Sequence, residues 1–137
     1  MGYLFVYGTL MRGCSNHSIL EPYILSLRSA AVQGQIWYLP EGYPMLFAGN
    51  SQVYGELVQC CDEQEALSQL DELEEYYGHG HDNNFYERTL ALATDLAGLT
   101  YNAWVYQCPA DKEAVMKAQG ILISSGDWRK FSTEFCK

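Results

Sequence analysis

The sequence predicts an α+β fold, in which a small twisted or closed β-sheet has a few helices packed outside it. Five or six short strand patterns follow one another, few helical patterns interrupt them, and no internal repeat or low-complexity linker separates them. The 137 residues, of which 48% are hydrophobic and 14% aromatic, suit a single compact domain spanning residues 1–137. A second domain is not expected.

The chain begins with a strand that breaks at a glycine. Residues 3–7 form a short apolar strand pattern, and "YGTL" follows, with Gly8 at the break. Ser15 or Asn16 can then cap a brief helix, because short polar side chains bond the free N–H groups of a first helical turn. Pro22 limits that helix.

Short strands and turns make up the next part of the chain. Residues 32–39 predict a strand, residues 41–44 a turn and residues 45–48 a further short strand, because Gly and Pro together punctuate a chain. Residues 52–59 predict a strand of mixed faces. Within it, Gly55 indicates a bend or a bulge.

A hairpin and a last helix complete the pattern. Residues 86–94 and 101–108 are two strand patterns separated by the Gly-containing segment 95–99, which predicts an antiparallel hairpin. A short helix is expected near Asp111, whose side chain could cap it.

The most informative helix is predicted for residues 62–76, "DEQEALSQLDELEEY". Asp62 followed three residues later by Glu65 is a capping-box pattern. At 100° per residue, one side of the helix is apolar, and the acids Glu65, Glu72 and Glu75 point away from it. Glu74 instead falls on the apolar side, which comprises Ala66, Leu67, Leu70, Leu73 and Tyr77.

A carboxylate directed into apolar surroundings must be paired or have its pKa raised, since desolvation disfavours its charged form. Glu74 could then act as a general acid or base near neutral pH. The alternative is that Glu74, in the last turn of its helix, reaches water or an arginine. Helix geometry leaves both interpretations open.

The net charge and the cysteine content indicate which classes of partner and which cellular compartment to expect. Seventeen acidic and eight basic residues give a net charge of −9, which opposes contact with nucleic acid or anionic membranes. No apolar run approaches the roughly 18 residues that span a bilayer, and no secretory signal is evident, so we expect a cytoplasmic protein. Five cysteines without CxxC spacing indicate reduced thiols and no structural zinc site; they are Cys14, Cys60, Cys61, Cys108 and Cys136.

Several spaced motifs, in the right order from about residue 3 to residue 108, resemble the γ-glutamylcyclotransferase-like superfamily. The resemblance is nearest to its γ-glutamylamine cyclotransferase branch and the related bacterial proteins. The segment "SSGDWRKF" near the end of the chain, residues 124–131, also resembles the bacterial members. The motifs are "FVYGTLMRGCSNHSIL", "YPMLFAG", "VYGELV", "LDELEEY", "FYERTLAL" and "AWVYQC".

This resemblance implies a small mixed β-barrel with flanking helices and a cofactor-independent, metal-free reaction. The α-amine of a γ-glutamyl group attacks its own γ-carbonyl, expels an amine and leaves 5-oxoproline. The resemblance places the catalytic acid/base at Glu74 and the substrate loop at Tyr7, Gly8, Thr9 and Leu10. It also places Tyr86 beside the site. We expect a small γ-glutamyl substrate and a monomer or small homo-oligomer.

Two departures from the family pattern concern the segment after the helix. Glu75 stands where the family often has Gly, and the loop at residues 77–84 looks enlarged, which leaves the leaving amine open. This loop carries "GHGHD", a pattern that a metal could use, but its glycines favour a mobile loop and suggest a lid over the site.

Other candidate residues keep two interpretations. Tyr7 could line the pocket or be a core aromatic. Arg88 could hold a substrate carboxylate or pair with nearby acids, and Tyr43 with Pro44 could shape a rim or simply a turn. Cys14 with His17 raises a thiol-nucleophile alternative, but cyclisation needs no covalent intermediate.

Three functions remain at this point. The first is an enzyme that releases 5-oxoproline from a γ-glutamyl amine or small γ-glutamyl peptide. The second is a non-catalytic module that binds a small acidic or amide ligand in the same pocket. The third is an interaction domain with an acidic face, although acidic charge alone serves solubility. A glutamate at position 74 favours the enzyme, because a binder needs no buried base.

Overall fold

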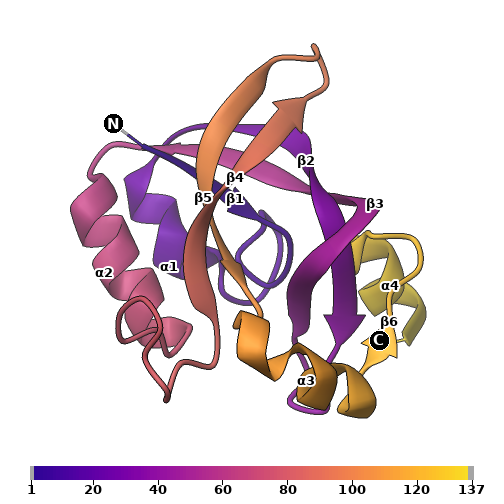
Figure 1. Cartoon of the computed structure of the whole chain (residues 1–137). Coiled ribbons are helices and arrows are strands. Elements are labelled where there is room, and N and C mark those ends of the chain that lie inside the picture. The colour runs from indigo at the N-terminus through magenta and orange to yellow at the C-terminus, as the bar shows by residue number, and fades with distance from the viewer. Residues whose placement is uncertain (1, 136–137) are drawn as a thin grey trace.

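The computed structural model describes residues 2–135, with side chains through residue 132 (Figure 1). Its strands are β1 (Tyr3–Val6), β2 (Ile24–Tyr38), β3 (Pro44–Cys60), β4 (Glu87–Asp95), β5 (Thr100–Gln107) and β6 (Ile121–Leu122). Its α-helices are α1 (His17–Leu20), α2 (Glu63–Leu73), α3 (Glu113–Gln119) and α4 (Trp128–Phe135). Single 3₁₀ turns precede β2, at Glu21–Tyr23, and α3, at Ala110–Lys112.

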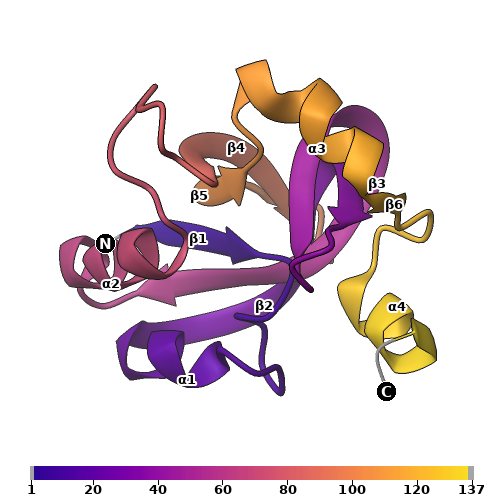
Figure 2. The same ribbon diagram turned by 90° about the horizontal axis from the view of Figure 1, so that it is seen from below.

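Five strands close into a mixed β-barrel. Following the pairings, β1 neighbours β3, β3 neighbours β2, β2 neighbours β4, β4 neighbours β5, and β5 returns to β1. The last contact is parallel, at Leu4 opposite Trp104, and the other four are antiparallel. Figure 2 shows α1, α2, α3 and α4 arranged around the outside of this barrel. The predicted α+β barrel with flanking helices is confirmed.

The long β2–β3 hairpin differs from the predicted series of short strands. The separate patterns at residues 45–48 and 52–59 belong to one strand, β3, and the strand predicted at residues 32–39 begins much earlier. A register shift between Gln33 and Gln35 explains the broken pattern. Of the bend or bulge predicted at Gly55, the bulge is wrong, because Gly55 pairs in regular register with Ala30.

Gly55 has a different role, which is to let two backbones approach each other. A Cβ atom at this position would lie 2.2 Å from the carbonyl oxygen of Val6 and 3.1 Å from the Cα atom of Tyr7. Only glycine fits such a contact. This contact seats the end of β1, and with it the start of the following loop, against β3.

Helix α2 begins as predicted and ends earlier. The Asp62 carboxylate accepts a hydrogen bond from the N–H of Glu65 at 3.1 Å, as a capping residue should. The helix ends at Leu73, and Glu74 is its C-cap. Leu73 and Tyr77, which the helical wheel assigned to the apolar side, are therefore 36% and 59% exposed.

Two predicted caps are wrong. Asn16 occupies the N-cap position of α1 but makes no side-chain cap bond; its amide donates to Thr9 Oγ1 at 2.9 Å. Asp111 lies within a 3₁₀ turn, and α3 begins at Glu113 without a side-chain cap.

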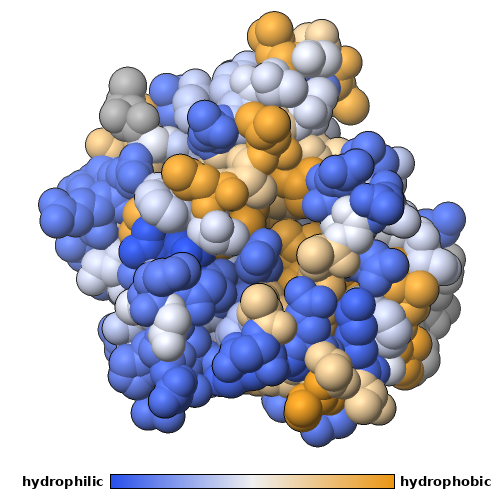
Figure 3. Space-filling view, viewed as in Figure 1, coloured by the Kyte–Doolittle hydropathy of each residue, from blue (hydrophilic) through white to orange (hydrophobic). Residues whose placement is uncertain are grey.

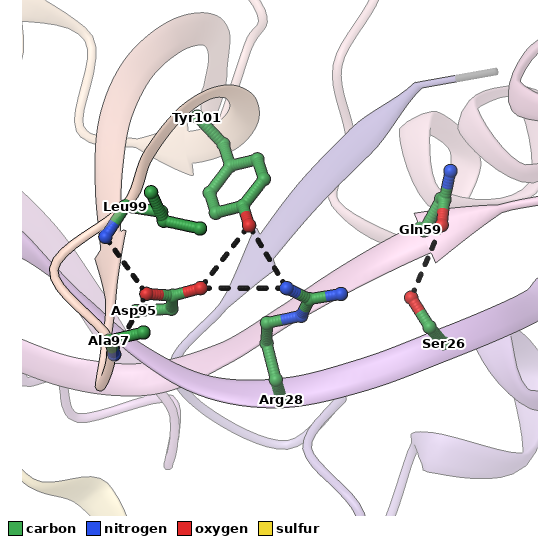
Figure 4. Close-up of polar contacts among 7 residues, drawn as sticks. All are labelled: Ser26, Arg28, Gln59, Asp95, Ala97, Leu99 and Tyr101. Atoms are coloured by element: carbon green, nitrogen blue, oxygen red, sulfur yellow. Dashed lines mark hydrogen bonds and ion pairs between the residues drawn. The ribbon is translucent and has the colours of Figure 1, made fainter.

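The β4–β5 hairpin, predicted almost to the residue, is held to β2 by Asp95 (Figure 4). One Asp95 oxygen accepts the N–H groups of Ala97 and Leu99, both at 3.0 Å, which shapes the turn. The other accepts Arg28 at 3.4 Å and the Tyr101 hydroxyl at 3.2 Å. The hairpin projects from the barrel, and apolar surface is exposed there (Figure 3), contributed by Leu90, Leu92, Leu96 and Leu99.

The core fills the barrel and the space beneath α2. Its largest fully buried side chains include Phe5, Phe47, Met11, Met45 and Ile36.

The cysteines within the described residues are free thiols, namely Cys14, Cys60, Cys61 and Cys108, and Cys136 lies outside the described residues. Within the described part of the chain, no helix is long and apolar enough to cross a membrane.

Candidate active site

A cleft opens where β1 ends and the "YGTL" segment begins. It encloses about 340 Å³ of space, including its open mouth. The six residues expected at the site, which come from three separate segments of the chain, all line it: Tyr7, Gly8, Thr9, Leu10, Glu74 and Tyr86. The remaining walls come from Phe5, Val6, Pro44 and Tyr106.

The loop after β1 uses its carbonyl groups internally. The carbonyl oxygen of Gly8 accepts the N–H of Met11 at 3.1 Å, and that of Thr9 accepts the N–H of Asn16 at 2.8 Å. The Leu10 carbonyl lies 3.0 Å from Nδ1 of His17, which donates to it as the Nδ1–H tautomer. These bonds fix the loop in one conformation.

The N–H groups of the same loop are not used. Within residues 2–135, no protein acceptor is recorded for the N–H of Gly8, Thr9 or Leu10. Buried N–H groups are normally paired, so donors beside a cleft are suited to a ligand that carries oxygen atoms. The three residues that carry these N–H groups all line the cleft.

Tyr7 and Tyr86 contribute rings to the cleft and hydroxyls to the scaffold. The Tyr7 hydroxyl donates to the carbonyl of Tyr106 and accepts the N–H of Leu46 at 3.1 Å, so it joins β5 to β3. The Tyr86 hydroxyl donates to the carbonyl of Pro44 at 2.7 Å. Burial raises the pKa of both tyrosines, which keeps them neutral.

Glu74 faces these rings from the end of α2. Its N–H donates to the Leu70 carbonyl at 2.8 Å, which fixes the backbone at the C-cap. The side chain is half-buried, and no hydrogen bond or ion pair to its carboxyl group is recorded among the described residues. The arginine in the alternative interpretation of Glu74 is therefore not found among the described residues.

Desolvation raises the pKa of Glu74 from its ordinary value of 4.5 to about 7. The pKa values of Tyr7, Tyr86 and Tyr106 are raised first by burial. The negative charge of Glu74 is a further cause for all three, which indicates that its carboxyl group lies close to them. A carboxyl group with a pKa near 7 can both accept and donate a proton at neutral pH.

An ion pair between Arg88 and Asp71, an acid that the sequence analysis did not single out, supports the wall beside Glu74. Asp71, one turn earlier on α2, accepts two hydrogen bonds from Arg88, at 2.8 and 3.2 Å, and one from the Tyr106 hydroxyl at 2.6 Å. The Arg88 guanidinium also lies over the rings of Tyr76 and Trp104, with 5.1 and 4.7 Å to the centroids.

Arg88 therefore pairs with a protein acid, the second of its two predicted roles. The signal available in the sequence was the spacing of Asp71 three residues before Glu74, which places both on neighbouring positions of one helix.

The thiol alternative does not fit the geometry. Burial raises the pKa of Cys14, which keeps it a thiol, and the His17 ring is engaged with the Leu10 carbonyl. Cys14 does not line the cleft.

The loop at residues 77–84 is pinned at its base. Asn84 is fully buried; its oxygen accepts the N–H of Tyr77 at 2.6 Å and its amide donates to Gly78 at 2.8 Å. Lys112 donates to the carbonyls of Asp82 and Asn84 at 2.9 and 2.6 Å. No residue of this loop lines the cleft, and whether it acts as a lid stays a hypothesis.

The histidines of this loop have other neighbours. His79 lies 3.2 Å from Glu87, and Nδ1 of His81 accepts the N–H of Asn83 at 3.1 Å. The described residues contain no group of three or more His, Cys, Asp or Glu side chains placed to hold a metal ion.

Glu75 carries backbone strain that predicts a stabilising substitution. Its φ angle of 53° lies in the left-handed region, which costs a non-glycine residue roughly 1 kcal/mol, and its side chain is exposed. We expect Glu75→Gly to raise the free energy of unfolding by about 0.5–1 kcal/mol in urea denaturation. Glu72→Gly, in the helix interior, should lower it by a similar amount; a loss of stability in both variants would contradict the assigned strain.

The fold and the cleft together define an α+β barrel protein in which a carboxyl group and three loop residues with unpaired N–H groups line one cleft. Comparison with protein families extends this description. The model of the γ-glutamyl cyclotransferase, AIG2-like family matches residues 4–130, nearly the whole chain. The chain belongs to this family, as its motifs indicated.

Two relatives carry related names. The chain is 37% identical over 103 residues to the γ-L-glutamyl-butirosin B γ-glutamyl cyclotransferase of Niallia circulans, which covers 75% of this chain and 64% of the relative. It is 27% identical over 141 residues to a putative γ-glutamylcyclotransferase of Methanocaldococcus jannaschii, with 96% and 98% of the two chains covered. The chain thus spans slightly less than two thirds of the Niallia relative.

Solved structures share the fold. YkqA from Bacillus subtilis matches with a TM-score of 0.67 at 22% identity, over 96% of this chain and 40% of its own. An uncharacterized protein of Pyrococcus horikoshii matches with a TM-score of 0.66 at 19% identity, over 98% and 95% of the two chains. At these identities the likeness concerns the fold alone.

Proposed function

We propose that this protein is a γ-glutamyl cyclotransferase that converts the γ-glutamyl group of a γ-glutamyl amine or small peptide to 5-oxoproline and releases the free amine. The observation that carries the proposal is the half-buried carboxyl group of Glu74, which shares one cleft with the three unused amides of Gly8, Thr9 and Leu10. Membership of the cyclotransferase family and the name of the Niallia relative support it.

The reaction starts with a proton transfer. The substrate α-ammonium is not a nucleophile until it loses a proton, and Glu74 in its ionised form takes that proton. The amine nitrogen then attacks the γ-carbonyl carbon, a C–N bond forms, and the carbonyl oxygen gains negative charge. A carboxylate with a pKa of about 7 is a far better base than one near 4.5.

The loop amides supply binding and charge stabilisation. N–H groups that are fixed before the reaction can hold substrate oxygens and the developing oxyanion without reorganising. The intermediate collapses when protonated Glu74 returns its proton to the departing nitrogen, and the original amide C–N bond breaks. The ring nitrogen still carries two hydrogens at this point, and the ionised Glu74 takes the second one and passes it to water, which leaves the lactam N–H of 5-oxoproline. One carboxyl group thus serves as base and then as acid.

The shape of the cleft serves ring closure. The extended glutamyl chain must fold back so that its amine meets its own carbonyl carbon, and a pocket that holds this geometry removes a large entropic part of the barrier. The buried rings of Tyr7, Tyr86 and Tyr106, with hydroxyls bonded to the scaffold or to Asp71, make a fixed wall for this purpose.

The proposal extends to the setting of the reaction. The net charge of −9 opposes contact with nucleic acid and with anionic membranes, and we propose a small-molecule γ-glutamyl substrate as the partner. We propose a single domain, residues 1–137, that acts in the cytoplasm as a monomer or small homo-oligomer.

The experiment is to incubate the purified protein with γ-glutamyl-ε-lysine, γ-glutamyl amino acids, glutathione and γ-L-glutamyl-butirosin B, and to measure 5-oxoproline. The proposal expects 5-oxoproline and free amine in equal amounts from at least one substrate. Binding of 5-oxoproline without turnover of any substrate would favour the non-catalytic module. If the protein showed no binding of 5-oxoproline and no turnover, the assignment of the cleft would be refuted.

A substitution at Gly8 tests how sensitive the loop is to one added methyl group. A Cβ at Gly8 would lie 2.6 Å from Cγ of Pro44, a rigid ring on the opposite wall of the cleft. We expect Gly8→Ala to displace the loop amides and raise KM about tenfold or more. Ser15→Ala, exposed on the same loop, is the control and should leave KM unchanged; equal KM values in both variants would count against the amide cradle.

A further inference from the structure

A buried carboxylate on the far side of the substrate loop has no part in the proposed reaction. Glu56 lies in β3 with its side chain 4% exposed. Its Oε1 accepts the N–H of Arg12 at 2.7 Å, and its Oε2 accepts the Arg129 guanidinium at 3.1 Å. A buried carboxylate is costly unless it is paired and hydrogen-bonded, and Glu56 satisfies both conditions.

Arg129 bonds the backbone of the same residue, Arg12, through its carbonyl group. The nitrogen that reaches Glu56 also donates to the carbonyl of Arg12, which is 117 residues away in the chain. The N–H of Arg12 is thus held by Glu56 and its carbonyl by Arg129, at the end of the loop that begins with Gly8. These two side chains thus bond the loop backbone, and neither of them lines the cleft.

The helix that carries Arg129 is itself fixed to the barrel. Trp128 is 6% exposed and stacks on Tyr38, with 6.1 Å between ring centroids. The carbonyl of Gly126 accepts the N–H of Tyr54 at 2.8 Å, and a Cβ at Gly126 would lie 2.1 Å from the Gln52 carbonyl oxygen. Helix α4 therefore presents Arg129 from a rigid base.

We propose that Arg129 is a positioning residue that, together with Glu56, holds the loop of residues 8–12 so that its three free amides face the substrate. The proposal rests on the proposed cyclotransferase function. It gives a role to the "GDWR" segment of the tail, whose glycine, tryptophan and arginine are the residues that seat α4 and grip the loop.

The expected consequence is weaker substrate binding with an unchanged acid/base group. Without Arg129, the Arg12 carbonyl loses a donor and Glu56 loses its counter-charge, so the loop samples positions in which its amides are misplaced. Glu74 stands at the C-cap of α2, in a different segment of the chain. Misplacement of a substrate-positioning group by about 1 Å can cost up to a hundredfold in rate.

The test compares Arg129→Ala and Arg129→Lys with Lys130→Ala, an exposed neighbour on the same helix, as control. With the substrate that gives the most 5-oxoproline, Arg129→Ala is expected to raise KM about tenfold and Arg129→Lys less. Addition of guanidinium chloride at about 20 mM should partly restore KM in Arg129→Ala. The pH midpoint of the acid limb of kcat/KM should not move.

A second readout does not need turnover. In ¹⁵N spectra, hydrogen exchange at the hydrogen-bonded loop amides of Met11 and Arg12 should be faster in Arg129→Ala than in wild type and Lys130→Ala. A folded Arg129→Ala protein with the exchange rates and the KM of wild type would overturn the proposal. An inactive wild type would instead refute the proposed function, and the exchange rates would still decide whether Arg129 holds the loop.

Discussion

Glu74→Gln is expected to lower kcat for 5-oxoproline formation by about 10²–10⁴-fold, the range that a positioned general acid/base supplies. Gln has nearly the same shape and can occupy the same half-buried position, but it cannot take a proton from the substrate ammonium or return one to the leaving amine. Because the loop amides remain in place, KM should change much less than kcat. Initial rates at saturating substrate measure the effect.

Glu72→Gln provides the matched control. Glu72 lies two residues earlier on α2, carries the same charge and is exposed away from the cleft. We expect its kcat to equal that of wild type. If Glu74→Gln retained wild-type kcat, or if both variants lost activity alike, Glu74 would not be the acid/base of the reaction.

The same substitution should stabilise the protein as it inactivates it. Burial raises the pKa of Glu74 from 4.5 to about 7, so the folded protein holds a proton in this interval that the unfolded chain has released. The contribution of Glu74 to the free energy of unfolding of wild type therefore falls as the pH rises from about 4.5 to about 7. The cost of ionising Glu74 reaches about 1–3 kcal/mol above pH 7, allowing for its partial exposure.

The neutral amide of Glu74→Gln avoids this cost. We expect the variant to exceed wild type in stability by about 1–3 kcal/mol at pH 8 and to match it near pH 4. Urea unfolding at both pH values measures the difference, with Glu72→Gln as control. A difference that is the same at both pH values would mean that the effect comes from packing and not from the charge of Glu74.

The fold was predictable where local pattern and tertiary structure agree. The strands around residues 86–108 and the start of α2 at Asp62 follow from alternation and capping. The β2–β3 hairpin was divided into pieces because the register shift at Gln33 and Gln35 interrupts the alternation. Strand β6 and helix α4 were not foreseen, since a two-residue strand and an eight-residue helix leave little periodicity to detect.

The part of the site that rests on local sequence pattern was also predictable. The helical wheel singled out Glu74, although the helix ends one residue before it and its inward direction depends on the C-cap. Asp71 with Tyr106 and Glu56 with Arg129 were missed, because each pair meets only when the barrel closes. Such long-range contacts leave no local periodicity, whereas the break at "YGTL" was visible as a turn.

The central claim is that burial gives Glu74 a pKa suited to acid/base catalysis at neutral pH. The most direct measurement is a ¹³C NMR titration of the glutamate carboxyl carbons in the ligand-free protein, with the Glu74 signal assigned by its loss in Glu74→Gln. The predicted midpoint is about 7, and the acid limb of kcat/KM should follow it. A midpoint near the ordinary value of 4.5 would contradict the claim.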